Sequence, residues 1–275
     1  MPQTLRVSTR NARFQQWESL LGNRTKRQRR GEFLVQGVRP ISMAVKNGWQ
    51  IRELLFDSSA QLSAWARETL ADVRAERFAV SRELMHELGG KADTVPELLA
   101  VVGIPEDSLD RIPAGPSMLV VLFDRPSSPG NIGTLVRSAD AFGADGVIIT
   151  GHAADVYDPK AVRATTGSLF GLPVVRVPSH QAVLTWLDEV RSTGVDLRVV
   201  GTDENGTPDA AEYDFTRPTL ALIGNETNGL SSSWRDACDD MVRIPMSGTA
   251  SSLNAATAAT VVLYEAARQR ALPRL

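Results

Sequence analysis

Three short segments combine glycines with amide, hydroxyl and charged side chains, the residue types that can hold and align a small ligand. They cover residues 128–137, 224–230 and 245–254. Glycine lets the backbone approach a ligand closely, and the N-terminus of a helix attracts an anionic group. The glycine spacing does not match the G-x-G-x-x-G pattern, so a dinucleotide fingerprint is absent. The three segments therefore predict a ligand site of another kind.

Five polar side chains in these segments are candidates for chemistry, and each also has a plain structural role open to it. They are Asn131, Arg137, Glu226, Ser252 and Asn254. Asn131 can cap a helix, and so can Ser252 or the serine before it. Arg137 can be a surface charge, and Glu226 can accept hydrogen bonds within its own turn. Asn254 falls in the first turn of the expected final helix, where asparagine is a poor helix former, which favours an additional duty.

These segments lie in a half of the chain where short apolar runs alternate with helical patterns. Strands are expected at 119–123, 146–150, 174–177, 197–201, 220–223 and 241–244, and helices at 132–142, 159–165, 179–193, 232–238 and 253–270. Strands that are apolar throughout and are separated by helices predict an α/β fold with a parallel sheet covered on both faces. Ligands bind beyond the carboxyl ends of such strands, and each of the three segments follows an expected strand.

The first half of the chain predicts a smaller β/α domain. Strands are expected at 33–35, 51–56, 78–80 and 99–104, and helices at 39–47 and 82–88, with a further helix capped at 57–59 and running to Leu70. A proline-rich stretch without apolar pattern then predicts a linker. The expected organisation is a basic N-terminal arm at 1–30, this smaller domain at 31–105, a linker at 106–116 and a second domain at 117–275.

The net charge of −2 conceals a strongly basic N-terminus, because residues 1–30 hold eight Arg or Lys side chains and one Glu. A basic arm on an acidic body favours a polyanionic partner such as RNA. A solvated, disordered tail is the alternative. The side chains expected to contact RNA are Arg24, Lys26, Arg27, Arg29, Arg30 and, beyond the arm, Arg39.

Composition excludes several other classes of protein. Hydrophobic residues make up 43% of the chain, which excludes wholesale disorder, and no apolar run approaches the ~20 residues of a membrane span. The N-terminus lacks the apolar core of a signal peptide, which favours a cytoplasmic protein without a membrane partner. The single cysteine, Cys238, and three scattered histidines give no metal-ligand spacing, so no metal is expected.

The order of the three segments resembles a known family. N-I-G-x-x-x-R, then I-G-N-E-x-x-G-L, then I-P-M-S-G-x-x-S-S-L-N is similar to the motifs of the SpoU/TrmH branch of SPOUT RNA methyltransferases, over residues 118–270. F-L-V-Q-G-V-R-P at 33–40 looks like the family's ribosomal-protein-like substrate-binding domain, although Gln36 stands where many members have Glu. N-A-R-F-Q-Q-W and D-R-P-S-S-P-G-N-I-G also resemble the avilamycin-resistance rRNA uridine methyltransferases within this branch.

The resemblance implies a C-terminal trefoil-knot domain that binds S-adenosylmethionine. The cofactor-binding residues that it implies are Gly201, Thr202, Gly224, Ile244, Met246 and Leu253. The acceptor would be a ribose 2′-hydroxyl, with Arg137 supplied by a second subunit. Asn131 and Ser252 would position the acceptor and its phosphate, while Glu226 and Asn254 would shape the pocket. Arginine stays protonated in proteins, which favours Arg137 as a phosphate clamp rather than a general base.

The implied function is 2′-O-methylation of RNA, with large-subunit rRNA and uridine favoured and with resistance to ribosome-targeted antibiotics as a further implication. The same chemistry on tRNA and a non-catalytic RNA-binding protein that retains the fold are the alternatives. A homodimer is expected because the final helix carries alanines on one face and Val261, Val262 and Tyr264 on another. A helix that is apolar over so much of its circumference requires burial on more than one side.

Overall fold

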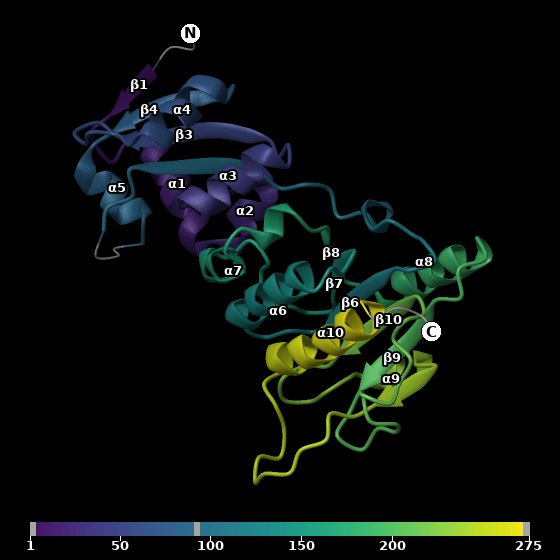
Figure 1. Ribbon diagram of the computed structural model, residues 1–275. Coiled ribbons are helices and arrows are strands. Elements are labelled where there is room, and N and C mark those ends of the chain that lie inside the picture. Colours follow the sequence, from purple (N-terminus) through teal and green to yellow (C-terminus); the bar gives the residue numbers. More distant parts are fainter. Residues whose placement is uncertain (1–3, 91–93, 272–275) are drawn as a thin grey trace. The chain divides into compact units, whose positions relative to one another are not determined.

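The computed structural model describes residues 4–90 and 94–271 and divides into two compact units (Figure 1). Unit 1 comprises Met1–Glu106 together with Asp155–Gly171, and unit 2 comprises Asp107–Ala154 and Leu172–Leu275. The division near residue 106 lies where the linker is expected. The segment Asp155–Gly171 was expected in the second domain but belongs to unit 1, because its aromatic side chains pack there. Tyr157 lies 4.8 Å from Phe33 between ring centroids, and Phe170 lies 5.0 Å from Trp49.

Unit 1 is built on a mixed five-stranded sheet in the order β1-β4-β3-β5-β2. In chain order its strands are β1 (Thr4–Val7), β2 (Glu32–Gln36), β3 (Ile51–Asp57), β4 (Glu76–Val80) and β5 (Leu98–Gly103). β5 runs antiparallel to both of its neighbours, and the other pairs are parallel. The helices are α1 (Ala12–Gly22), α2 (Arg24–Arg30), α3 (Val38–Lys46), α4 (Ala64–Asp72), α5 (Arg82–Leu88) and α7 (Pro159–Thr165), with the short η2 (Ser168–Phe170).

The basic N-terminal segment is folded into unit 1 rather than forming a separate arm or a disordered tail. Its β1 pairs with β4, and α1 places Phe14, Trp17 and Leu20 in the core, each at most 2% exposed. These three apolar residues recur at helical spacing, which is the signal that the surrounding charges obscured. Deleting residues 1–30 would therefore remove part of the core of unit 1.

Arg27 corrects the expectation that it contacts RNA. Its side chain is 2% exposed and forms an ion pair with Asp155, itself 5% exposed, at 2.7 Å. Arg27 also donates to the backbone oxygen of Leu20 at 2.6 Å. A buried charge must be paired in this way, because an unpaired one would be very costly. Arg27 therefore holds α2 against the segment that begins at Asp155 and has no surface to offer a ligand.

Unit 2 has a six-stranded sheet in the order β11-β9-β10-β6-β7-β8, and every pair in it is parallel. The expected α/β fold with a parallel sheet is thus confirmed. Its strands are β6 (Leu119–Asp124), β7 (Gly146–Thr150), β8 (Val174–Val177), β9 (Arg198–Thr202), β10 (Thr219–Ile223) and β11 (Asp240–Val242). Its helices are α6 (Pro129–Ala141), α8 (His180–Ser192), α9 (Ser232–Ala237) and α10 (Ala255–Ala271), with the short η1 (Leu109–Arg111).

Several local expectations differ from the structure in an informative way. α4 begins at Ala64 because the Ser63 hydroxyl accepts from the backbone N–H of Ala66, whereas β3 ends at Asp57 and residues 58–59 form a turn. The expected linker is partly packed, since Ile112 is 3% exposed and lies against Gly146 in unit 2. In each case a cap or a buried contact fixes the boundary, and composition alone did not locate it.

Candidate active site

A cavity of about 580 Å³ lies where three loops leave the carboxyl ends of β9, β10 and β11 in unit 2. It is lined by side chains or backbone from β9 and the loop after it, the β10–α9 loop, the β11–α10 loop and the start of α10. Because neighbouring parallel strands end at one edge of the sheet, segments far apart in sequence meet there. The second and third of the three motif segments supply most of this lining.

Glu226 joins the first motif segment to the second. One carboxylate oxygen accepts from the Ser127 backbone N–H at 3.1 Å and from its hydroxyl at 2.9 Å. The other accepts from the Asn131 side-chain amide at 2.8 Å. Burial opposes ionisation of Glu226, but these hydrogen bonds outweigh it and leave the pKa of the carboxyl below its ordinary value. Glu226 is therefore a charged carboxylate held by neutral donors.

Asn254 links the third motif segment to the first. Its amide nitrogen donates to the side-chain oxygen of Asn131 at 3.1 Å. Its own side-chain oxygen accepts from the backbone N–H of Ala256 at 3.0 Å, so Asn254 caps α10. Neither Ser252 nor the serine before it provides this cap, and the cap of α6 is Ser128 rather than Asn131. Asn131 is thereby free to stand between Glu226 and Asn254, which makes the three side chains a continuous chain of hydrogen bonds.

Arg125 supports this arrangement and was not singled out from the sequence. Its backbone has a φ of +51°, a left-handed conformation that is uncommon outside glycine. Its guanidinium donates to the backbone oxygen of Gly229 at 3.1 Å and to the buried carboxylate of Asp124 at 3.0 Å. Its own carbonyl accepts from the Asn225 amide at 2.7 Å. Arg125 thus ties the loop after β6 to the loop after β10, which carries Glu226.

Most of the expected cofactor-binding residues line the cavity. Those that do are Thr202, Gly224, Ile244, Met246 and Leu253. Gly201 does not: it lies within β9, where an added Cβ would come within 2.6 Å of the Met241 sulfur and 2.7 Å of the Cys238 sulfur. Its small size is therefore required for packing inside unit 2. Gly201 is not among the residues that line the cavity, and its contact with the cofactor stays a prediction.

Gly224 lines the cavity, but its own chain explains why glycine is needed there. An added Cβ would lie 2.3 Å from the carbonyl carbon of Gly229 and 2.4 Å from the backbone nitrogen of Leu230. The turn is closed by two backbone hydrogen bonds of 3.0 Å between Asn225 and Gly229. A larger residue at 224 would therefore distort the turn that holds Glu226, whether or not a ligand is bound.

Charged residues that are not predicted from the sequence also line the cavity. Asp203, directly after β9, lines it together with Glu204, Asn205 and Arg235. Arg235 forms an ion pair with Asp203 at 2.5 Å, and the Asn205 backbone N–H donates to the same carboxyl at 3.0 Å. Burial opposes the ionisation of Asp203, but these partners leave its pKa lowered. The only available signal was an acidic residue directly after a strand, which is too common to be specific.

Ser252 lines the cavity beside Leu253, whereas Arg137 does not line it. The Arg137 side chain is exposed on α6, and among the described residues it has no hydrogen-bond or ion-pair partner. α6 packs against α10, where the hydroxyls of Ser138 and Thr260 are 2.7 Å apart and the Phe142 and Tyr264 rings lie 5.8 Å apart. A single copy of the chain therefore joins Asn131, Glu226 and Asn254 by hydrogen bonds and places Glu226 and Ser252 in the cavity lining, but Arg137 belongs to neither set.

The described residues contain no helix long and apolar enough to cross a membrane. They also contain no group of three or more His, Cys, Asp or Glu side chains placed to hold a metal ion.

Comparison with known protein families gives two matches that fall on the two halves of the chain. The profile described as the SpoU L30e-like domain matches residues 11–100. The profile described as the SpoU rRNA Methylase family matches residues 118–264, which is more than half of the chain. The second match contains all three motif segments.

Individual relatives resemble the chain over nearly its whole length. A 23S rRNA (uridine(2479)-2′-O)-methyltransferase of Streptomyces viridochromogenes is 61% identical over 98% of this chain and 94% of its own length. The 23S rRNA (guanosine(2553)-2′-O)-methyltransferase RlmP of Bacillus subtilis is 28% identical over 94% of this chain and 96% of its own. The crystal structure of the SpoU methyltransferase AviRb from S. viridochromogenes in complex with AdoMet matches with a TM-score of 0.93 and 61% identity, over 96% of this chain and 100% of that one.

Proposed function

Because the chain belongs to the SpoU rRNA methylase family, we propose that it transfers a methyl group from S-adenosylmethionine to a ribose 2′-hydroxyl in 23S rRNA. The observation that carries this proposal is the meeting of Glu226, Asn131 and Asn254 beside one cavity, in a chain so similar to a known 2′-O-methyltransferase. An enzyme of this class is favoured over a non-catalytic RNA-binding protein because the motif side chains form one connected site.

The cavity suits S-adenosylmethionine in size and in chemistry. About 580 Å³ is within the usual range for a small-molecule site, and Ile244, Met246 and Leu253 offer apolar surface for an adenine ring. Glu226 has a lowered pKa and only neutral donors around it, so its carboxylate is negative at neutral pH and complements a cationic ligand, whereas Asp203 is already paired with Arg235. The bound cofactor supplies an electrophilic methyl group.

The chain's own polar residues would align the acceptor. A neutral ribose hydroxyl is a weak nucleophile, so its orientation and the fate of its proton limit the reaction. Asn131 is held at its nitrogen by Glu226 and at its oxygen by Asn254, which fixes the plane of its amide. The remaining N–H of that amide and the hydroxyl of Ser252, which lines the cavity, can position the acceptor and its phosphate. Arg137 would clamp the phosphate through its planar guanidinium.

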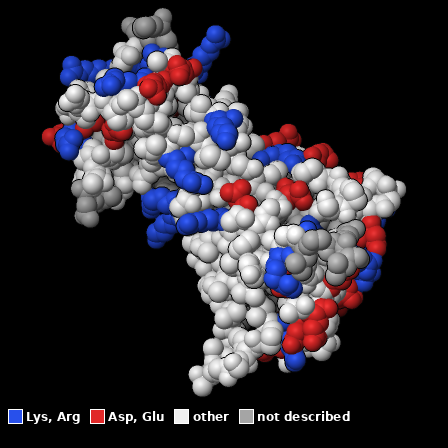
Figure 2. Space-filling model, viewed as in Figure 1, with Lys and Arg blue, Asp and Glu red and all other residues white. Residues whose placement is uncertain are grey.

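The clamp requires a second copy of the chain, and we therefore infer a homodimer. Arg137 is exposed and lies outside the cavity of its own chain. On α10, Val261 is 37% exposed and Tyr264 is 55% exposed, although both are large and largely apolar. Figure 2 shows only uncharged side chains over the N-terminal half of α10. Burial of this surface in a closed two-fold dimer, the commonest oligomer, supports an active site completed by the partner.

A trefoil knot is the further structural feature that we propose for unit 2. The long crossing from β11 through residues 243–254 into α10, which returns to pack on α6 and β10, supports it.

A uridine in the large-subunit rRNA is the favoured target, because the relative that is 61% identical is named a 23S rRNA uridine 2′-O-methyltransferase. An rRNA substrate implies a cytoplasmic protein. Resistance to a ribosome-targeted antibiotic is a separate proposal. It is tested by expressing the chain in a susceptible host and measuring drug tolerance.

The direct test is transfer of a labelled methyl group to purified RNA. We expect label in 23S rRNA and none in tRNA, and mapping should place a 2′-O-methyl group on one uridine. RNA with 2′-deoxyuridine at that position is the matched control and should accept no label. Label in tRNA alone would favour the tRNA alternative. Cofactor binding without transfer to any RNA would favour the non-catalytic alternative.

A further inference from the structure

We propose that a groove between α1 and α2 of unit 1 binds a phosphodiester strand of the substrate RNA, through fixed hydrogen-bond donors. The groove has a volume of about 530 Å³ and is lined by Ala12, Gln15, Gln16, Ser19, Lys26, Arg29 and Arg30. Its lining contains three cationic side chains and two amides, and it contains no carboxylate among the described residues. This inference rests on the proposed function, because it takes the polyanion to be the RNA that is methylated.

The cations of the N-terminal segment differ in whether a carboxylate neutralises them. Arg10 is paired with Glu18 and Glu87, and Arg13 is paired with Glu53 and Glu76. Lys26 and Arg29 are exposed, and no described residue forms an ion pair or a hydrogen bond with the side chain of either. Unpaired cations that share one groove attract a polyanion more strongly than the same number of neutralised ones.

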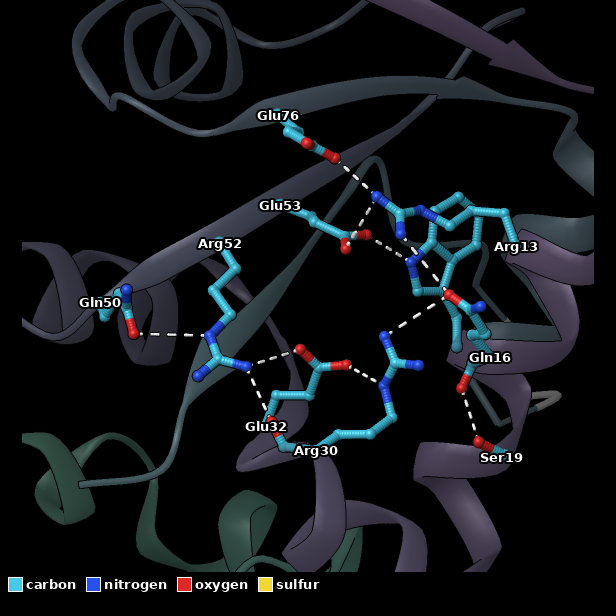
Figure 3. Close-up of polar contacts among 10 residues, drawn as sticks. Arg13, Gln16, Ser19, Arg30, Glu32, Gln50, Arg52, Glu53 and Glu76 are labelled. Carbon is cyan, nitrogen blue, oxygen red and sulfur yellow. Dashed lines mark hydrogen bonds and ion pairs between the residues drawn. The ribbon is translucent and has the colours of Figure 1, made fainter. Parts of the chain in front are cut away.

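Two neighbouring residues, Glu32 and Arg52, hold Arg30 in place. Its Nε donates to the buried carboxylate of Glu32, which is 6% exposed and also accepts from Arg52 at 2.9 Å (Figure 3). Arg52 donates in addition to the Arg30 backbone oxygen at 2.9 Å. Arg30 is 33% exposed, and among the described residues its Nη1 has no acceptor. A guanidinium fixed in this way loses little side-chain entropy when it binds an anion.

Gln16 presents an N–H donor to the groove because hydrogen bonds fix the orientation of its side-chain amide. Its oxygen faces the guanidinium of Arg13 at 3.5 Å and that of Arg30 at 3.4 Å (Figure 3). Guanidinium groups only donate, so the amide oxygen must face them and the amide nitrogen must face away. Within the described part of the chain that nitrogen has no acceptor. The groove therefore offers ammonium, guanidinium and amide N–H groups, and these match the oxygens of an RNA backbone.

The test replaces the two unpaired cations without disturbing the core. The variant K26Q/R29Q changes two exposed side chains, and K46Q/R67Q is the matched control. The control removes the same charge from exposed positions of unit 1 that do not line the groove. Binding of 23S rRNA is measured against salt concentration, together with KM and kcat for methyl transfer and with cofactor affinity. Point variants are required because deletion of residues 1–30 would remove core residues such as Trp17.

We expect K26Q/R29Q to raise KM for RNA while kcat and cofactor affinity stay unchanged. Two lost contacts with a single strand should lower the salt slope by about 1.4, so the variant should lose about sevenfold less affinity than wild type for a fourfold rise in salt. Gln16→Met should also raise KM, and without changing the salt slope, because it removes an amide and no charge.

Two results would overturn the inference while leaving the proposed function intact. One is an unchanged KM and salt slope in K26Q/R29Q when wild type methylates 23S rRNA. The other is an equal change in the control variant, which would indicate general attraction by the charge of unit 1. Failure of wild type to methylate any RNA would instead contradict the proposed function, and RNA binding that still depends on the groove would then be measured separately.

Discussion

Carboxylates serve opposite purposes in the two units. In unit 2, Glu226 is held by the neutral donors of Ser127 and Asn131, so it keeps its negative charge beside the cavity. In unit 1, Glu32 is 6% exposed and forms an ion pair with Arg30, so its negative charge orients a guanidinium. The first arrangement suits a cationic small molecule, and the second suits an anionic strand.

The partners of a buried acid therefore indicate what its site can bind. A carboxylate satisfied by amides and hydroxyls remains a net negative charge, whereas one satisfied by arginine becomes structural support. Glu53 shows an intermediate case, because it accepts from Trp17 at 2.5 Å and pairs with Arg13 at 3.2 Å. Burial raises its pKa even though both partners favour the charged form.

The largest expected effect concerns the buried pair of unit 1. Arg27→Gln should destabilise unit 1 by about 3–5 kcal/mol, because it leaves the buried Asp155 without its cation. Arg29→Gln, two residues away and exposed, is the control and should leave the free energy of unfolding nearly unchanged. Denaturant unfolding of both variants measures the difference. Equal stability would mean that Arg27 is not buried in solution, and its expected RNA contact would have to be reconsidered.

A smaller effect, confined to catalysis, is expected on α6 of unit 2. Arg137→Ala should lower kcat about 100-fold through loss of phosphate positioning, with cofactor affinity unchanged, and Arg137→Lys should restore little.

The Arg137→Ala variant should complement Leu253→Arg, whose new cation would block the cofactor cavity, with Leu253→Met as the volume-conserving control. Because a two-fold dimer of the two variants has one intact site, co-expression should recover up to about half of wild-type activity. No recovery in a verified heterodimer would place Arg137 in the active site of its own subunit.

The smallest effect separates Glu226 from Glu53 by the sign of their pH dependence. The lowered pKa of Glu226 gives stability that is present above its ordinary pKa and is lost as pH falls through the lowered value. The raised pKa of Glu53 does the opposite, so stability is lost as pH rises from the ordinary pKa to the raised one. Thermal unfolding of Glu226→Gln and Glu53→Gln should therefore diverge from wild type in opposite directions as pH rises from about 4 toward neutrality. Parallel trends would contradict the contrast between the two acids.

Much of unit 2 could be predicted from the sequence because its signals are local. Uniformly apolar strands such as 119–123 and 220–223, separated by helical patterns, indicate the parallel sheet, and the carboxyl ends of its strands place the site. Unit 1 was harder to predict. Its first helix carries Phe14 and Trp17 at helical spacing, but the arginines around them indicate an exposed arm.

The residue types of the site were set by the sequence: the amides, hydroxyls and carboxylates of three motifs, and the cations at the N-terminus. Only the tertiary structure decided which of them meet. It placed Asn131 between Glu226 and Asn254, left Arg137 outside the cavity, and buried Arg27 while Lys26 and Arg29 stayed exposed. The physical reason is that a side chain's type fixes what it can donate or accept, whereas its partners depend on contacts between residues far apart along the chain.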